Sequence, residues 1–310
     1  MDRAGTLEAR AERSLPVRVV RRFLRADGMS HSRALGYETM LIVFSGFIGL
    51  LGLASLLDLE QIRGTVTELG RSLAPGPSGE LLRDAAASGA RHGSTAALVG
   101  LAGAVLAGTI AMAEIERTGN RIAGLERDRR LVFRYVMAFL LTVTVGLAFV
   151  AGGMALGAGR AIPTGLGWSD ELRGVWSVVR WPVGIAVIAA AILLLFRVAP
   201  KASLGPWRSL LAGTVVALVL WVALTGLLSL YFSLASDSSP YGPLLAIVAL
   251  MLWSMLGSLA LAIGMATAAE LSHARRPHEH PDEDEAVTLP EPPEAERAPA
   301  LTAHRRTYGF

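Results

Sequence analysis

The sequence contains no cysteine, so it forms neither a disulfide bond nor a thiolate metal site, and the redox compartment stays undetermined. Lysine is almost absent as well, because Lys201 is the only lysine among 29 basic residues. Charge of either sign is missing from four long stretches, residues 93–113, 135–159, 210–236 and 238–269. About 20 helical residues cross the ~30 Å hydrocarbon core of a bilayer. These stretches therefore predict transmembrane helices.

The high hydrophobic content predicts an all-α, polytopic membrane protein. Hydrophobic residues make up 52% of 310 residues, and a soluble core of that size does not hide helices this long and apolar. We predict six transmembrane helices, at about residues 36–57, 94–113, 135–158, 175–196, 210–234 and 244–269. They form a transmembrane domain over residues 36–272, between a cytoplasmic segment 1–35 and an acidic, Pro-rich cytoplasmic tail 273–310 that is expected to be disordered.

The basic residues predict the orientation of these spans. The N-terminus and the second and fourth connections hold 8, 6 and 3 basic residues, against 4, 3 and 0 in the other connections. Because Lys and Arg accumulate on the cytoplasmic side, we expect both termini inside, in a bacterial cytoplasmic (inner) membrane. An amphipathic helix over residues 16–26 is expected to lie on the anionic inner leaflet. Two short helices between the first two spans are expected on the outer interface.

Short patterns of aromatic, glycine and polar residues lie near the ends of the predicted spans. Their positions are Phe23, Asp27, Gly28, Tyr37, Asn120, Arg121, Pro200, Gly213, Tyr231, Tyr241, Gly242, Trp253 and Gly264. In order and spacing, over roughly residues 17–276, they resemble the YihY/BrkB family of bacterial inner-membrane proteins, formerly labelled ribonuclease BN. The resemblance implies an integral membrane protein of a family associated with virulence and envelope integrity rather than with one defined reaction.

Two positions depart from the family pattern. Phe44-Ser45 stands where the family has Phe-Pro, which removes a kink from the first span. Ala266 stands where the family has a glutamate. Glu270, one helical turn later, and Glu38, in the first span, are two candidates to replace that carboxylate, and the sequence leaves this open.

Four charges within or beside the spans are the candidate functional residues, namely Glu38, Arg180, Arg197 and Glu270. An ionisable group inside a span faces the protein interior or a water-filled cavity, so Glu38 is a candidate to relay protons or to contact a cationic headgroup. The alternative is that Glu38 lies near the interface and pairs with Arg33 or a neighbouring arginine. Arg180 and Arg197 flank the fourth span, where they either extend to the interface or bind a lipid phosphate.

No pattern in the sequence predicts catalysis. There is no P-loop and no nucleophile triad, and His278-Glu279-His280 lies in a Pro-flanked tail that does not hold a coordination geometry. We therefore expect no enzyme activity, no metal, no cofactor and no nucleic-acid partner, but contacts with membrane lipids and an unidentified substrate. The first hypothesis is a transporter-like role for an amphiphilic or anionic envelope component. The alternative is a non-transporting membrane organiser, and a tRNA-processing nuclease comes last.

Overall fold

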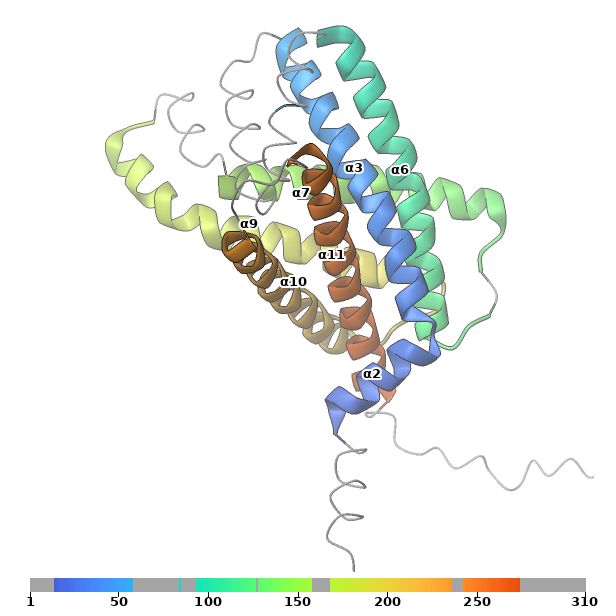
Figure 1. The fold of residues 1–310 in the computed structure, drawn as a ribbon. Helices are drawn as coiled ribbons and strands as arrows, with labels where there is room; N and C mark the ends of the chain where they lie inside the picture. Colours follow the sequence, from blue (N-terminus) through green and yellow to red (C-terminus); the bar gives the residue numbers. More distant parts are fainter. Residues whose placement is uncertain are drawn as a thin grey trace, which may run out of the picture. The chain divides into compact units, whose positions relative to one another are not determined.

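The computed structural model describes residues 14–57, 84, 93–126, 128–157, 168–235 and 242–273, and the regular elements among them are all α-helices. A short helix, α2 (Leu15–Arg25), precedes six long ones (Figure 1). These are α3 (Gly28–Leu56), α6 (Gly93–Ile122), α7 (Leu131–Gly157), α9 (Asp170–Val198), α10 (Trp207–Ala235) and α11 (Gly242–His273). Each of the six is long and apolar enough to cross a membrane. The prediction of an all-helical protein with six spans is confirmed.

Several helices extend beyond the apolar segments that predicted them. α3 begins at Gly28, eight residues before the predicted span, and α6 continues to Ile122, nine residues beyond it. α9 begins at Asp170, where the Ser169 side chain accepts a hydrogen bond from the backbone N–H of Leu172. The reason is that hydropathy records only the apolar part of a helix, whereas the backbone hydrogen-bond ladder continues through polar residues to a cap.

The N-terminal helix α2 confirms the helix predicted over residues 16–26. Val19 and Phe23 are buried against the other helices. Three apolar side chains on another side of α2 remain exposed, namely Val17, Val20 and Leu24. Asp27, in the left-handed region with φ of 51°, turns the chain from α2 into α3. Gly28 follows at a position where a Cβ would overlap the Phe23 ring. Contact of the exposed side of α2 with the inner leaflet stays a prediction.

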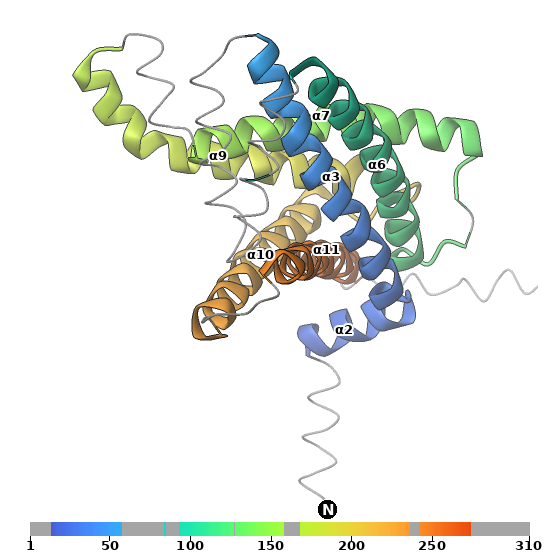
Figure 2. The same ribbon diagram turned by 45° about the horizontal axis from the view of Figure 1, so that its top comes forward.

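The six long helices form three pairs, α3 with α6, α7 with α9, and α10 with α11, and α11 also packs against α3 about as extensively as α7 packs against α9. The α7–α9 pair runs across the α3–α6 pair rather than along it (Figures 1 and 2). Each pair has a glycine–glycine contact, namely Gly49 with Gly100, Gly152 with Gly184, and Gly213 with Gly264. A Cβ on Gly264 would lie only 2.7 Å from the carbonyl oxygen of Gly213. Small residues thus let the backbones approach closely, as is usual in lipid.

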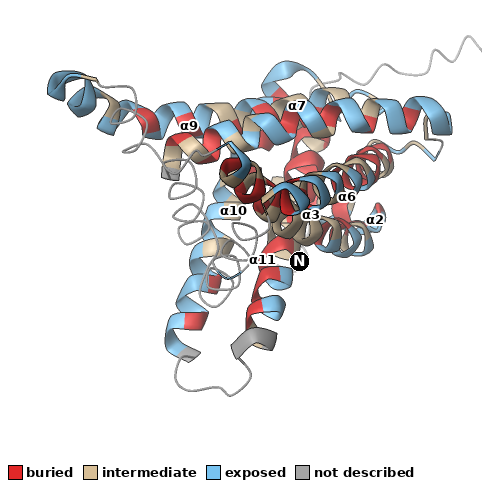
Figure 3. Ribbon diagram, turned by 90° about the horizontal axis from the view of Figure 1, so that it is seen from above, coloured by how far each residue is buried: buried red, intermediate tan, exposed pale blue. Residues whose placement is uncertain are grey.

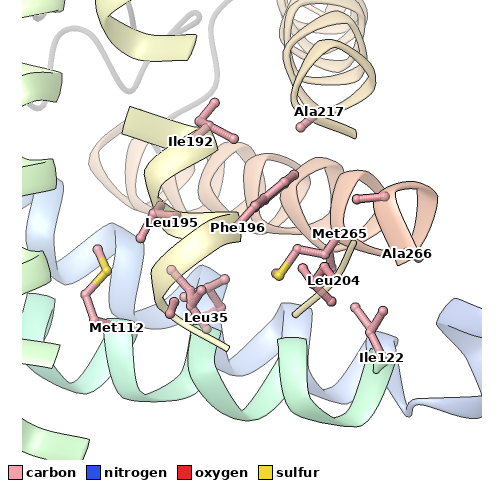
Figure 4. Packing of buried hydrophobic residues seen from close by; sticks show 14 of the residues in the cluster. Leu35, Met112, Ile122, Ile192, Leu195, Phe196, Leu204, Ala217, Met265 and Ala266 are labelled. Carbon is pink, nitrogen blue, oxygen red and sulfur yellow. The ribbon is translucent and has the colours of Figure 1, made fainter. Parts of the chain in front are cut away.

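The largest apolar core lies where α6, α9 and α11 meet, and it includes Phe196, Ile122 and Met265 (Figure 4). A smaller cluster joins α10 to α11 around Trp253, whose Nε1 donates a hydrogen bond to Thr225 Oγ1 at 3.1 Å. Figure 3 shows that the helix faces that do not pack against these clusters are largely exposed. Exposed large apolar side chains occur on all six of them. Such faces suit hydrocarbon rather than water as the surrounding solvent.

Three sequence predictions lie outside the described residues. These are the helices expected on the outer interface between α3 and α6, the tail beyond residue 273, and Tyr241 of the family-like patterns.

Candidate functional site: a charged network at one end of the helices

Charged and polar side chains gather where α2 and the beginnings of α3 and α7 meet the ends of α6, α9 and α11. We call this group the end network. Its members are Arg18, Arg22, His31, Glu114, Glu116, Arg117, Asn120, Asp128, Arg129, Arg134 and Glu270. The helix ends that carry the most basic residues in the sequence therefore lie together, as alternating transmembrane connections require.

Glu270 joins the last span to the N-terminal helix. Its Oε1 lies 3.1 Å from Arg18 Nε, and its Oε2 accepts a hydrogen bond of 2.7 Å from Arg22 Nε. Arg22 Nη1 also donates to the backbone oxygen of Ile122 at 3.0 Å, at the end of α6. One carboxylate and one guanidinium therefore tie α2 to two spans. Charge-assisted hydrogen bonds of this kind are stronger than neutral ones.

Glu114 joins α3 to α6. Its Oε1 lies 2.6 Å from His31 Nδ1, and its Oε2 accepts a hydrogen bond of 2.7 Å from Arg117 Nη1. Thr118, one turn later on α6, donates its hydroxyl to the backbone oxygen of Glu114 at 2.8 Å. The carboxylate thus has partners on both oxygens.

Asp128 connects the α6–α7 turn to both helices. Its Oδ1 accepts a hydrogen bond of 3.1 Å from Asn120 Nδ2, and its Oδ2 lies 3.6 Å from Arg134 Nη1 and 3.7 Å from Arg117 Nε. Burial by itself raises the pKa of Asp128, but the Asn120 hydrogen bond and the nearby guanidinium groups of Arg134, Arg121 and Arg117 outweigh it. The net pKa of Asp128 lies below its ordinary value, so this carboxylate is ionised at neutral pH.

Arg129 holds the end of α9. Its guanidinium donates to three successive backbone oxygens, those of Ala199 at 2.8 Å, Pro200 at 3.1 Å and Val198 at 3.2 Å. These carbonyls lie at and directly after the last residue of α9, where a cation is favoured by the helix dipole. Glu116 in turn accepts a hydrogen bond from the backbone N–H of Arg129 at 3.2 Å and lies 3.6 Å from its Nη1. α6 and α9 are thereby connected through one arginine.

Asn120 connects the same regions without charge. It is fully buried, and its Oδ1 accepts a hydrogen bond of 2.7 Å from the backbone N–H of Lys201, in the connection between α9 and α10. With the bond from its Nδ2 to Asp128, both ends of the amide are used. Gly119 beside it packs against the Pro200 ring, at a distance that leaves no room for a Cβ.

The four candidate charges occupy different places. Glu270 belongs to the end network. Glu38 is half-buried in α3, two turns beyond His31, and no hydrogen bond or ion pair to it occurs among the described residues. Glu114 is a negatively charged neighbour that interacts electrostatically with Glu38. Arg197 is exposed near the end of α9, whereas Arg180, 17 residues earlier on the same helix, is buried.

The family-like positions mostly lie where elements join. Phe23, Asp27 and Gly28 form the α2–α3 junction. α6 is joined to the α9–α10 connection by the hydrogen bond between Asn120 and the Lys201 N–H and by the contact of Gly119 with Pro200. Three further contacts involve these positions: Gly213 packs against Gly264, Trp253 is hydrogen-bonded to Thr225, and Arg121 Nη1 donates to the Leu125 oxygen at 2.8 Å. Gly242 begins α11, and Tyr37 and Tyr231 are exposed.

His31, Asp128, Arg129 and Arg134 were not singled out from the sequence as functional residues. Arg134 is almost fully buried and donates from Nη2 to the backbone oxygen of Ala113 at 2.6 Å. The available signal was the density of charge in residues 114–134, which indicated a cytoplasmic connection but not which side chains pair. Ala266, where the family has a glutamate, is buried among apolar residues of the core.

The model of the Virulence factor BrkB family matches residues 19–288 of this chain. The chain belongs to this family. The resemblance drawn from the short patterns is therefore confirmed, and the protein is a multi-pass membrane protein of the BrkB family. The ribonuclease-like protein YfkH of Bacillus subtilis (strain 168) is 26% identical over 270 residues, which cover 84% of this chain and 96% of YfkH.

A second relative is the UPF0761 membrane protein azo3165 of Azoarcus sp. (strain BH72). It is 23% identical over 247 residues, which cover 79% of this chain and 59% of that protein. No solved structure matches the chain. For this BrkB-family protein, the end network is an arrangement of hydrogen-bonded ion pairs that joins helices. Among the described residues, no group of three His, Asp or Glu side chains has the arrangement of a metal site.

Proposed function

We propose that this BrkB-family protein transports or otherwise handles an amphiphilic, anionic component of the cell envelope. The observation that supports this proposal is Glu38, which lies half-buried in a transmembrane helix without a hydrogen bond or ion pair among the described residues. Ionisable groups at such positions are costly in lipid and usually mark the path of a substrate or a proton. Glu38 is therefore the residue that we assign to the transport step.

The end network supports the same role. It connects α2, α3, α6, α7, α9 and α11 through hydrogen bonds and ion pairs at one end, so it is a place where the helices are held together and from which they can separate. Transport by alternating access needs such a closed end. We place this end on the cytoplasmic side, because it carries the larger number of basic residues.

The test uses proteoliposomes of phosphatidylcholine that contain fluorescent phosphatidylglycerol as the probe. Its movement between leaflets is followed by dithionite quenching at several pH values, for the wild type and for Glu38→Gln. We expect Glu38→Gln to slow the movement and to flatten its dependence on pH. Glu126→Gln is the matched control, because Glu126 is an exposed acid in the α6–α7 turn. Movement that is equal in all three proteins at every pH removes Glu38 from the mechanism.

A non-transporting organiser is the competing function. It predicts that deleting residues 277–310 abolishes the envelope phenotype while the purified protein moves no lipid. The name of the Bacillus relative raises a ribonuclease-like activity for that protein. We propose a non-enzymatic role here, and metal-dependent RNA cleavage by the detergent-purified chain would contradict it.

A further inference from the structure

Arg180 is a buried cation to which the described part of the chain supplies no counter-charge. Its side chain lies in α9, and the residue is only 9% exposed. Its Nε donates one long hydrogen bond, of 3.3 Å, to the backbone oxygen of Ser177, and its guanidinium lies over the Trp181 ring, 5.3 Å from the centroid. No carboxylate pairs with it among the residues that the structure describes. Buried charges are normally paired or fully hydrogen-bonded, whereas the described residues give this guanidinium one hydrogen bond and no carboxylate.

A second unused donor lies beside it. Trp176 precedes Arg180 by four residues, so the two side chains are neighbours on one face of α9. Trp176 Nε1 is buried, and no described residue accepts a hydrogen bond from it. Its ring is held edge-on by Trp168, with 5.8 Å between the ring centroids. Two kinds of N–H donor, from an indole and a guanidinium, are therefore available within one helical turn.

The position of this pair along α9 suits a lipid headgroup. Arg180 precedes Val198 by 18 residues, which corresponds to about 27 Å of helix. Since the Val198 end of α9 is held by Arg129 in the end network, Arg180 lies, counted along the helix, about one hydrocarbon thickness from that network. Tryptophan is enriched at that depth. Figure 3 shows the first half of α9 as mostly exposed, and exposed apolar side chains next to the pair include Val175, Val178 and Val179.

We propose that Arg180 and Trp176 form a binding site for the phosphate of an amphiphile, at the membrane surface opposite the end network. The guanidinium fork donates to two phosphate oxygens, and the indole N–H donates to the phosphate as well. The acyl chains of the amphiphile lie along the exposed valines of α9. This inference rests on the proposed function and specifies its binding site.

The test measures binding rather than transport. The full chain is placed in phosphatidylcholine nanodiscs, and phosphatidylglycerol with brominated acyl chains is titrated while tryptophan fluorescence is recorded. Bromine quenches nearby indoles, and Trp168, Trp176 and Trp181 all lie at the site. We expect Arg180→Gln to weaken binding by about ten- to a hundredfold, the effect of removing charge-assisted hydrogen bonds.

The controls separate this site from general charge and from misfolding. Arg197→Gln removes the same charge from the exposed other end of α9 and should leave binding unchanged. Trp176→Phe removes the indole N–H while keeping an aromatic ring, and it should weaken binding less than Arg180→Gln does. Arg180→Lys keeps the charge and guards against a folding defect in Arg180→Gln, which is checked by thermal unfolding. We expect Arg180→Lys to bind more tightly than Arg180→Gln.

The outcomes are distinct. Competition by inorganic phosphate would identify free phosphate as a ligand of the site, and its failure to compete would identify the lipid headgroup. Equal binding by wild type and Arg180→Gln, or equal loss in Arg180→Gln and Arg197→Gln, overturns the proposal. Binding that depends on Arg180 in a protein that moves no lipid would leave this site standing and remove the transport function. Binding that does not depend on Arg180, in a protein whose lipid movement depends on Glu38, would remove this site and leave the transport function standing.

Discussion

Asn120 joins the end network to the connection between α9 and α10. Its amide bonds to the Lys201 backbone on one side and to Asp128 on the other, and it is fully buried. Asn120→Ala removes both bonds and leaves the Lys201 N–H without a partner. We expect a loss of about 1–3 kcal/mol in the free energy of unfolding. Thermal unfolding in detergent measures it, with exposed Glu126→Ala as a control that should change stability by less than about 0.5 kcal/mol.

Asp128 makes stability depend on pH. Its pKa in the folded protein lies below the value of about 3.9 in an unfolded chain. The stability contributed by its ion pairs is therefore fully present above about pH 4 and is lost as the pH falls through the folded-state pKa. Unfolding temperatures recorded from neutral pH down to about pH 3 should fall more steeply for the wild type than for Asp128→Asn. Parallel curves for the two proteins would show that Asp128 contributes nothing in this range.

At the scale of elements, the glycine contacts determine how closely paired helices approach. A Cβ on Gly100 would lie 2.5 Å from Gly49 Cα and 2.8 Å from the Ser45 oxygen, and both are backbone atoms that do not move aside. Gly100→Ala should therefore push α6 from α3 and destabilise the protein by about 1–3 kcal/mol. Gly146→Ala is the matched control in α7, because no atom lies within 4 Å of its Cβ position. It should be neutral or stabilising by up to about 1 kcal/mol.

The attachment of α2 depends on Glu270. Glu270→Ala removes the shared partner of Arg18 and Arg22. If the lost hydrogen bonds contribute about 1.4 kcal/mol, the backbone amides of α2 should exchange with deuterium about ten times faster. Asp170→Ala breaks the Arg173 ion pair, in which the Asp170 side chain is 97% exposed, and should leave exchange in α2 unchanged. Equal exchange in Glu270→Ala and the wild type would show that apolar packing and the hydrogen bond from Arg22 to Ile122 hold α2 without Glu270.

At the scale of the whole molecule, the orientation in the membrane is open to a direct test. Because the chain has no cysteine, single cysteines are labelled without background. We expect Glu171→Cys, in the first turn of α9, to react with an impermeant maleimide in intact spheroplasts. Arg25→Cys and Glu126→Cys should react only after permeabilisation, because the end network is expected to face the cytoplasm. The opposite pattern of labelling would show that the end network faces the outside of the cell.

The sequence alone determined that the helices of this protein are surrounded by lipid, and it determined the number of spans. Uninterrupted apolar stretches such as 135–159 and 210–236 have no stable alternative to a lipid-embedded helix, since every backbone polar group in hydrocarbon must be bonded within the segment. The order and spacing of the short patterns, including those around Asn120 and Gly213, also indicated the family, because they can be compared without knowing the fold.

Only the tertiary structure decided which charges meet. Glu270 lies 248 positions from Arg22 in the sequence, and Arg129 lies 70 positions from the Ala199 carbonyl that it binds. Hydropathy contains no information on such pairs, because it records the transfer of each residue to lipid and not the neighbour it finds there. Arg180 and Arg197 look alike in the sequence, as two arginines that flank one span. Packing buries one and exposes the other, and this difference separates a candidate ligand site from an ordinary interfacial charge.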